Sequence, residues 1–268
     1  MRLPNPSTAM LLPAALVVAG LATAAAPPSG GTAPVARVVD DAAERYEALD
    51  EEAGEAISEW SQAWRKAYFA AREAGEQPPA RPPSPAIEYG AKFLAAAADY
   101  AGTDDAVPFL GWVVTSGVEK AHVTSAVATI TASHLGSERL EPIAPTLPRL
   151  ARTLGDDEAM RFLDALRAEN GHPGVKAWAT YARHSETLSG GDIDSEDFQT
   201  AFAETEALVE AADDETLSRT WRGQVMARIE FAIGKVAPDI EGIDLGGSDF
   251  KLSDYEGKVV FLDFWGDW

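Results

Sequence analysis

The chain has 268 residues, of which 46% are hydrophobic, a composition that supports a packed core and excludes wholesale disorder. Its 43 acidic residues outnumber 22 basic ones, and the formal net charge of -21 excludes nucleic acid as a partner, because such binding needs basic side chains against phosphates. The 268 residues contain no cysteine, which excludes a disulfide framework and a cysteine-ligated metal site within them.

Residues 1–26 have the pattern of a signal peptide. Arg2 is followed by an apolar run over residues 9–26, and small residues near its end form an A-x-A cleavage pattern. A retained N-terminal anchor is the alternative, which three prolines in this stretch disfavour. We therefore expect an exported protein of the periplasm or cell envelope, with no membrane contact beyond this segment.

Residues 27–84 are expected to hold a spacer, a long amphipathic helix and a proline-rich linker. Apolar residues follow one helical seam, namely Tyr46, Leu49, Ala53, Ala56, Trp60, Ala63 and Ala67. This seam favours packing on the helix's own domain over a coiled-coil dimer, because it is short and half alanine. Five prolines between Pro78 and Pro85 predict a stiff extended spacer, with a proline-rich ligand for a partner domain as the alternative.

Residues 85–233 are predicted to form an α-helical domain, an array or bundle. Glycines and N-cap candidates separate the helical patterns, and no strand pattern interrupts them. The expected helices are Ile87–Tyr100, Asp105–Thr115, Val118–His134, Leu140–Leu154, Asp157–Glu169, Val175–Ser189, Ser195–Ala212 and Glu215–Ile233.

The pattern changes near residue 235, where a second domain is expected to begin. Gly246-Gly247-Ser248-Asp249 predicts a turn, and Val259–Phe264 is a run of β-forming residues, five of six apolar. Such a run is typical of a central strand that is buried on both faces.

Residues 234–268 resemble the start of redoxin domains of the thioredoxin-like TlpA/ResA type. Gly234–Asp239 is similar to the G-x-x-A-P-x opening of that family, and Leu252–Val260 to its LSDxxGKxV signature, with the family's hairpin between them. Phe264–Trp268 resembles the F-W-x-x-W that precedes the family's C-x-x-C. Peroxiredoxins share the earlier part, but F-W-x-x-W favours the thioredoxin branch.

The resemblance implies a central sheet flanked by helices, with a redox pair at a helix N-terminus after the strand. The helix dipole and free amides would lower the pKa of the first nucleophile there. Asp263 stands where the family keeps a buried acid that accepts the proton of the resolving thiol. The alternative for Asp263 is a solvent-facing residue at a strand end. Trp265 and Trp268 would be aromatic neighbours of the redox site.

By the family pattern, the nucleophile would follow Trp268 directly. Three interpretations of the chain end stay open: a fragment, a truncated gene, or a UGA codon for selenocysteine translated as a stop. A selenol would preserve the chemistry, because it is more acidic and leaves more readily than a thiol. As given, residues 234–268 are expected to pack poorly, since a hairpin and one strand do not make a stable sheet.

The predicted fold is mostly α, followed by the N-terminal fragment of an α/β thioredoxin fold. The function implied by the resemblance is thiol- or selenol-disulfide exchange with a disulfide-containing protein or a thiol redox partner. The alternative is a non-enzymatic exported binding protein with a vestigial redoxin domain, and peroxide reduction would need a pocket that this segment lacks. The four histidines lack metal-site spacing, no phosphate-binding loop occurs, and neither a metal nor a cofactor is expected. Residues around Asn170–Ala179 resemble helical regions that precede redoxin domains in exported bacterial proteins.

Overall fold

The computed structural model describes residues 35–117 and 119–263. They form a helical array that ends in one two-stranded sheet, which confirms the predicted fold class. The signal-peptide pattern of residues 1–26 and the residues Trp265 and Trp268 lie outside the described residues. No helix in the described part of the chain has both the length and the apolar character that crossing a membrane requires.

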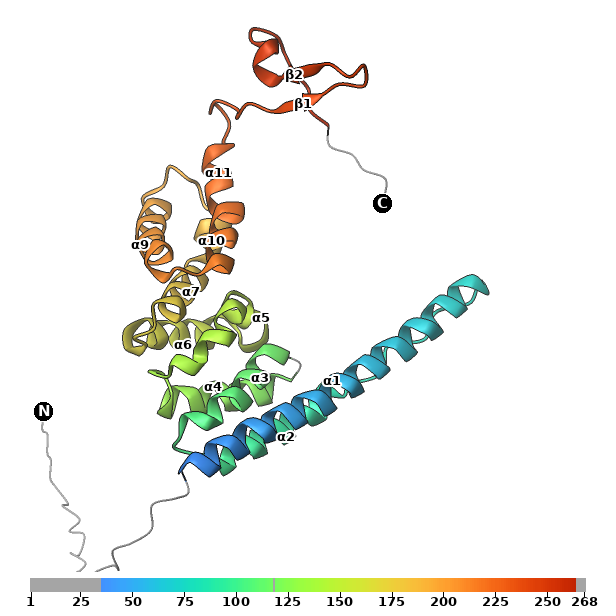
Figure 1. The fold of residues 1–268 in the computed structure, drawn as a ribbon, viewed down its shortest axis with the longest axis vertical. Coiled ribbons are helices and arrows are strands. Elements are labelled where there is room, and N and C mark those ends of the chain that lie inside the picture. The colour runs from blue at the N-terminus through green and yellow to red at the C-terminus, as the bar shows by residue number, and fades with distance from the viewer. Residues whose placement is uncertain (1–34, 118, 264–268) are drawn as a thin grey trace, which may run out of the picture.

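The elements follow one another along the molecule from α1 to the hairpin (Figure 1). They are α1 (Val35–Glu73), α2 (Ala86–Asp99), η1 (Asp104–Ala106), α3 (Val107–Ser116), α4 (Lys120–Ser133), η2 (Glu138–Arg149), α5 (Leu150–Leu154), α6 (Asp156–Glu169), α7 (Pro173–Arg183), α8 (Ser185–Gly190), α9 (Glu196–Ala212), α10 (Glu215–Trp221), η3 (Arg222–Met226), α11 (Ala227–Glu230), β1 (Glu241–Ile243), β2 (Asp249–Lys251) and η4 (Leu252–Tyr255).

The first half of α1 packs on the helical body. Tyr46 lies edge-on to Phe93 and Phe109, with ring centroids 6.0 and 5.5 Å away. Glu52 accepts hydrogen bonds from the Tyr89 hydroxyl at 2.9 Å and from Lys92 at 3.1 Å, so α2 is tied to α1 by charge as well as by apolar contact. Packing of α1 on its own domain is confirmed, and the seam is therefore not free for a coiled coil.

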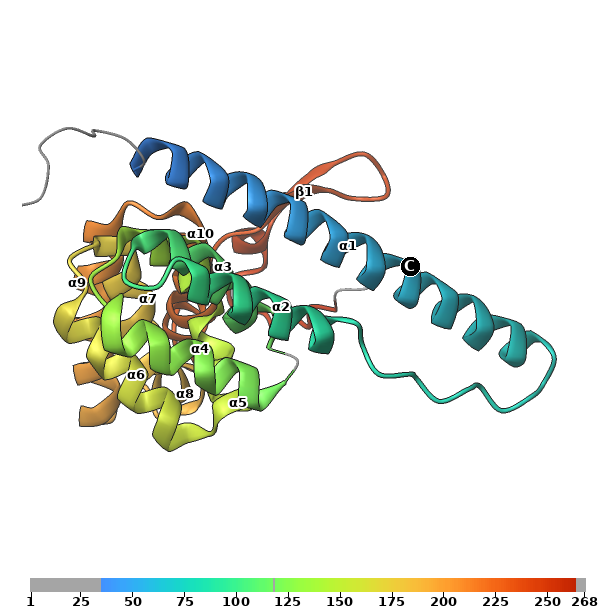
Figure 2. The same cartoon turned by 90° about the horizontal axis from the view of Figure 1, so that it is seen from below.

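The second half of α1 extends past the body, and the proline-rich segment returns along it (Figure 2). The Arg81 guanidinium lies over the Trp60 and Trp64 rings at 4.4 and 5.1 Å, and Trp64 Nε1 donates to the Pro79 carbonyl at 3.3 Å. The segment has no helix or strand, because proline lacks the amide donor and prefers an extended backbone. We call α1 beyond Ile57 together with this returning segment the arm.

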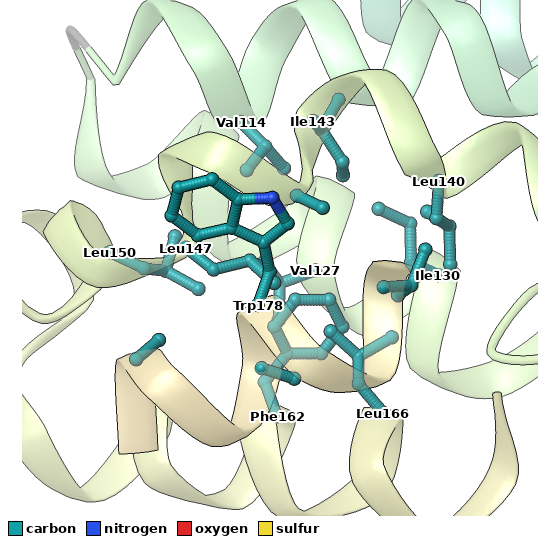
Figure 3. Close-up of a cluster of buried hydrophobic side chains, with 14 of the residues drawn as sticks. Val114, Val127, Ile130, Leu140, Ile143, Leu147, Leu150, Phe162, Leu166 and Trp178 are labelled. Atoms are coloured by element: carbon teal, nitrogen blue, oxygen red, sulfur yellow. The ribbon is translucent and has the colours of Figure 1, made fainter. Parts of the chain in front are cut away.

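The centre of the helical body is α7, which packs against η2, α6 and α9. Its Trp178 is 3% exposed and lies within a cluster of aliphatic and aromatic side chains from α3, α4, η2, α5 and α6 (Figure 3). The Trp178 Nε1 donates to Asp214 at 2.8 Å, and Asp214 also caps the N-terminus of α10. Trp178 therefore joins the two halves of the array, the elements before α7 and the helices after it.

Three of the predicted helices differ from the structure. The expected helix Leu140–Leu154 is instead the 3-10 helix η2 followed by α5, because Pro142, Pro145 and Pro148 recur every third residue and remove the donors that an α-helix needs. The expected helix Val175–Ser189 breaks at His184 into α7 and α8. The expected helix Glu215–Ile233 contains the π-helical turn η3 and ends at Glu230.

The prediction of a buried strand over Val259–Phe264 is wrong for the residues that the structure describes. Its described part, residues 259–263, has no strand, and Phe261 is 89% exposed. The reason is that the described sheet has two strands only, so nothing covers the run on either face. The expectation that this segment packs poorly is confirmed.

Candidate functional site

The segment that resembles redoxin domains is held together by short-range polar contacts. The carboxylate of Asp239 accepts hydrogen bonds from the Ser253 amide and the Ser253 hydroxyl, both at 2.8 Å. Asp239 precedes β1 and Ser253 follows β2, so these bonds close the segment into a loop. The A-P-D and L-S-D parts of the signature are thus in direct contact.

The predicted hairpin is present. Strands β1 and β2 pair antiparallel, with Gly242 opposite Phe250. In the turn, Asp244 Oδ1 accepts from the amides of Gly246 at 2.8 Å and Ser248 at 2.9 Å. Gly247 has a φ of +83°, a conformation that a residue with a side chain rarely adopts, which explains the glycine in the turn.

Lowering the pH is expected to release the contact between Asp239 and Ser253. The backbone hydrogen bond from Ser253, followed by the bond from its hydroxyl, lowers the pKa of Asp239 below its ordinary value. A depressed folded-state pKa gives stability that is complete above the unfolded-state pKa, about 3.9, and is lost as the pH falls through the folded-state pKa. We expect the NMR signal of the Ser253 amide to move only below about pH 4.

The variant Asp239→Asn should abolish this titration of the Ser253 amide, and Asp249→Asn, which changes an exposed acid of the same hairpin, should leave it intact. A Ser253 amide that titrates unchanged in Asp239→Asn would contradict the assignment.

Of the three predicted redox-site residues, the structure describes Asp263. Asp263 is exposed and forms no hydrogen bond or ion pair with any residue that the structure describes. Trp265 and Trp268 lie outside the described residues. Asp263 as a proton acceptor and the two tryptophans as its neighbours therefore stay predictions.

A groove between α1, α3 and η2 is the feature that sequence reasoning missed. It has a volume of about 680 Å³ and is lined by Tyr46, Asp50, Pro108, Gly111, Trp112, Thr115, Arg139, Pro142 and Ile143. Its walls are mainly apolar, as in sites that bind apolar groups. The residues come from three elements far apart in sequence, so no motif could have revealed them.

Trp112, Asp50 and Arg139, three of the polar residues of this groove, have partners within the chain. Trp112 stacks on Phe93 with ring centroids 4.0 Å apart, and its Nε1 donates to Asp50 at 3.0 Å. Arg139 forms an ion pair with Asp105 at 3.1 Å. A Cβ at Gly111 would lie 2.7 Å from Ile143 Cγ2, so glycine is what lets η2 approach α3 here. The lining contains no nucleophile–base pair, so it offers space for an apolar group and no catalytic arrangement.

Two of the four histidines, His134 and His184, belong to separate polar clusters. His184 contacts Glu204 at 2.9 Å, and Arg167 joins Glu204 and Asp164, which links α6, α7 and α9. His134 lies 3.3 Å from Asp104 at the other end of the array. Among the described residues, no three metal-ligating side chains lie close enough to hold an ion.

Comparison with known proteins relates the chain to a redox family over a short segment. The thiol-disulfide oxidoreductase ResA of Geobacillus kaustophilus (strain HTA426) is 57% identical over 37 residues, 14% of this chain and 21% of the relative. Over this short segment the chain is similar to ResA. The ResA of Geobacillus thermodenitrificans (strain NG80-2) is 54% identical over 37 residues, and that of Bacillus anthracis is 42% identical over 48 residues.

The similarity covers only a part of this chain and only a part of each relative. The chain spans about a fifth of the length of the Geobacillus proteins and 28% of the Bacillus anthracis protein. The two 37-residue matches are close in length to residues 234–268, the segment that resembles redoxin domains. No family model matches the chain. No solved structure matches it.

Proposed function

We propose that this chain is part of an exported thiol- or selenol-disulfide oxidoreductase of the redoxin family, with a helical domain over residues 85–233 and a redoxin domain that begins at residue 234. The observation that carries the proposal is the 57% identity to ResA over 37 residues. The hairpin and the contact between Asp239 and Ser253 support it, because the signature residues are the ones that shape this segment.

The distribution of exposed apolar side chains also supports a larger domain. Outside residues 231–262, the exposed large hydrophobic residues among those described are Phe69 and Ile87. Within that segment there are eleven, among them Leu245, Val259 and Phe261. An unpaired apolar run of this kind is an aggregation hazard unless further strands and helices cover it.

In the proposed reaction, a nucleophile that follows Trp268 attacks a disulfide of the partner protein. One partner sulfur leaves as a thiolate, and a mixed disulfide forms between the nucleophile and the other sulfur. The resolving thiol then gives its proton to Asp263 and attacks the nucleophile's sulfur or selenium, which releases the second partner thiolate. In the completed sheet Asp263 would lie where the family keeps its buried acid, in position to accept this proton.

The first test is to read the coding DNA beyond the codon of Trp268. A cysteine or UGA codon, followed in frame by x-x-Cys and a thioredoxin-like remainder, is the expected result. A frame with no such continuation would overturn the enzyme proposal and leave the alternative of an exported helical binding protein with a vestigial redoxin segment.

In the protein completed in this way, Asp263→Asn is expected to slow the second step about 100-fold at pH 7, the low end of what a positioned acid–base group contributes. The first step, formation of the mixed disulfide, should keep its rate, because Asp263 takes no part in it. Rapid-quench measurement of both steps with a disulfide-containing protein checks this. Glu256→Gln, a change of an exposed acid in the same segment, is the matched control. Equal slowing of both steps would argue against proton transfer by Asp263.

A further inference from the structure

We propose that the outward face of α1 pairs antiparallel with the same face of a second copy of this chain, about a twofold axis at Ser58. We call this face the stripe. Its residues follow one another in steps of three or four: Glu44, Glu47, Glu51, Gly54, Ser58, Gln62, Arg65, Phe69 and Arg72. The stripe lies opposite Tyr46, Leu49 and Ala53, which pack on the body. The proposal is independent of the redox function.

The stripe is open to a partner along its whole length. Its residues are exposed, whereas the returning segment of the arm covers the side of Trp60 and Trp64. In Figure 2, α1 runs along the edge of the helical body, and Figure 1 shows the hairpin at the far end of the array. A second helix can therefore approach α1 without displacing any described element.

The two halves of α1 carry opposite charge. Residues 42–59 contain seven acidic residues and one basic residue, Arg45, and Arg45 is paired with Asp99. Residues 60–73 contain three basic residues and one acidic residue. On the stripe, Glu44 and Glu51 lie in the acidic half, and Arg65 and Arg72 lie in the basic half. None of these four forms an ion pair with another residue that the structure describes.

The positions of these four charges are symmetric about Ser58, and the sign of the charge is opposite on the two sides. Glu51 and Arg65 lie seven residues before and after Ser58, and Glu44 and Arg72 lie fourteen residues before and after it. Residues seven apart share one face of a helix, so a twofold axis at Ser58 places each glutamate opposite an arginine of the other copy. The face is thus complementary to itself, as a twofold dimer interface must be.

Two residues on the stripe have no explanation within one copy. Gly54 lies inside a helix, where glycine is about 1 kcal/mol less favourable than alanine, and a Cβ built on it meets nothing within 4 Å. Phe69 is 60% exposed. In the proposed pair, Gly54 faces Gln62 and lets the two helices come close, and Phe69 packs beside Glu47 against the second helix.

The nature of the contact sets the strength of the dimer. Exposed ion pairs contribute about 0–1 kcal/mol each. The proposed interface has four of them, because each of the two Glu–Arg contacts occurs twice by symmetry, and it has one small aromatic contact of Phe69 at each end. Salt at about 0.5 M weakens such exposed pairs, because the Debye length falls to roughly the distance between the paired charges. We therefore expect a weak dimer that forms in low salt and dissociates when salt is added.

The test is sedimentation velocity of the purified chain and two charge variants. Arg65→Glu with Arg72→Glu leaves only acidic charges on the stripe, and Glu44→Arg with Glu51→Arg leaves Glu47 as its one acid beside four arginines. Each variant alone should be a monomer, because like charges then face each other. An equimolar mixture of the two should form a heterodimer, since each of the four glutamates at the symmetric positions of one variant then faces an arginine of the other. The control Arg152→Glu with Arg161→Glu changes the charge equally on exposed positions of α5 and α6 and should dimerise like the parent.

Failure to fold cannot imitate the expected result, because unfolded variants would not recover a defined heterodimer on mixing. The proposal is overturned by a parent chain that stays monomeric at 100 µM in low salt, by dimeric single variants, or by a mixture that stays monomeric. A monomeric parent that sediments with vesicles of phosphatidylserine and phosphatidylcholine, and loses this binding in the acidic variant, would assign the basic half to a membrane surface instead.

Discussion

Replacing Trp178 with alanine is expected to lower the free energy of unfolding by about 3–5 kcal/mol, as large-to-small changes of a buried aromatic residue do. The side chain fills the middle of the cluster in Figure 3 between α7, η2 and α6, so its loss leaves a cavity that these helices cannot close. The change also removes the hydrogen bond from Nε1 to Asp214. Urea denaturation followed by far-ultraviolet circular dichroism measures the effect.

Two variants separate these contributions. Trp178→Phe keeps most of the apolar volume and loses the hydrogen bond, and should cost about 1–2 kcal/mol. Phe69→Ala removes an aromatic residue that is 60% exposed and should change the stability of the monomer by less than about 0.5 kcal/mol. A loss below about 1 kcal/mol in Trp178→Ala would mean that the two halves of the array do not depend on this contact.

Replacing Asn170 with alanine is expected to cost about 2–4 kcal/mol, because three hydrogen bonds of one buried amide are lost together. Its Nδ2 donates to the carbonyls of Leu135 at 2.6 Å and Ser137 at 3.1 Å, and its Oδ1 accepts from the His172 amide at 2.8 Å. These bonds join the turn between α6 and α7 to the loop after α4. Without them, buried carbonyls would lie without donors.

Thermal unfolding of Asn170→Ala tests this effect against Gln199→Ala. Gln199 also donates from a side-chain amide to a backbone carbonyl, that of Ile193 at 2.6 Å, but it is exposed. Water replaces that bond, so Gln199→Ala should cost less than about 0.5 kcal/mol. Equal losses in the two variants would show that burial does not set the value of the Asn170 bonds. The bonds of Asn170 give a structural role to the Asn170-Gly171-His172-Pro173 sequence, which resembles helical regions before redoxin domains.

Local patterns determined most of the helix positions. Helices α2, α3, α4, α6 and α9 lie within a few residues of the segments predicted from apolar spacing and caps, because such signals act over three to five residues. The differences arise where a local feature acts against the apolar pattern. The prolines of η2 are visible in the sequence, but whether they end a helix or tighten it into a 3-10 helix depends on the packing of Leu140, Ile143 and Leu147 in the core.

In the C-terminal segment, too, the features that depend on local contacts could be predicted, and those that depend on distant partners could not. The turn at Gly246-Gly247 and the contact between Asp239 and Ser253 form within about fifteen residues, so the sequence sufficed to predict the hairpin. The strand at Val259 depends on partners distant in the chain, and apolar character alone cannot supply them. For the same reason Asp263 could be named as a candidate from its position in a motif, while its surroundings could not be derived.

The sequence by itself determined the helical class, the amphipathic α1, the hairpin and the resemblance to redoxins, since each is written in residues that are neighbours in the chain. Only the tertiary structure decided that the body covers the first half of the apolar seam of α1 and that the returning proline-rich segment covers the side of Trp60 and Trp64. The opposite face, with its charges at positions symmetric about Ser58, is left to solvent. The same holds for the groove beside Trp112 and for the part of Asn170, because both bring together residues from elements more than thirty positions apart. The physical reason is that packing free energy depends on which surfaces meet, and a linear pattern records only that a surface exists.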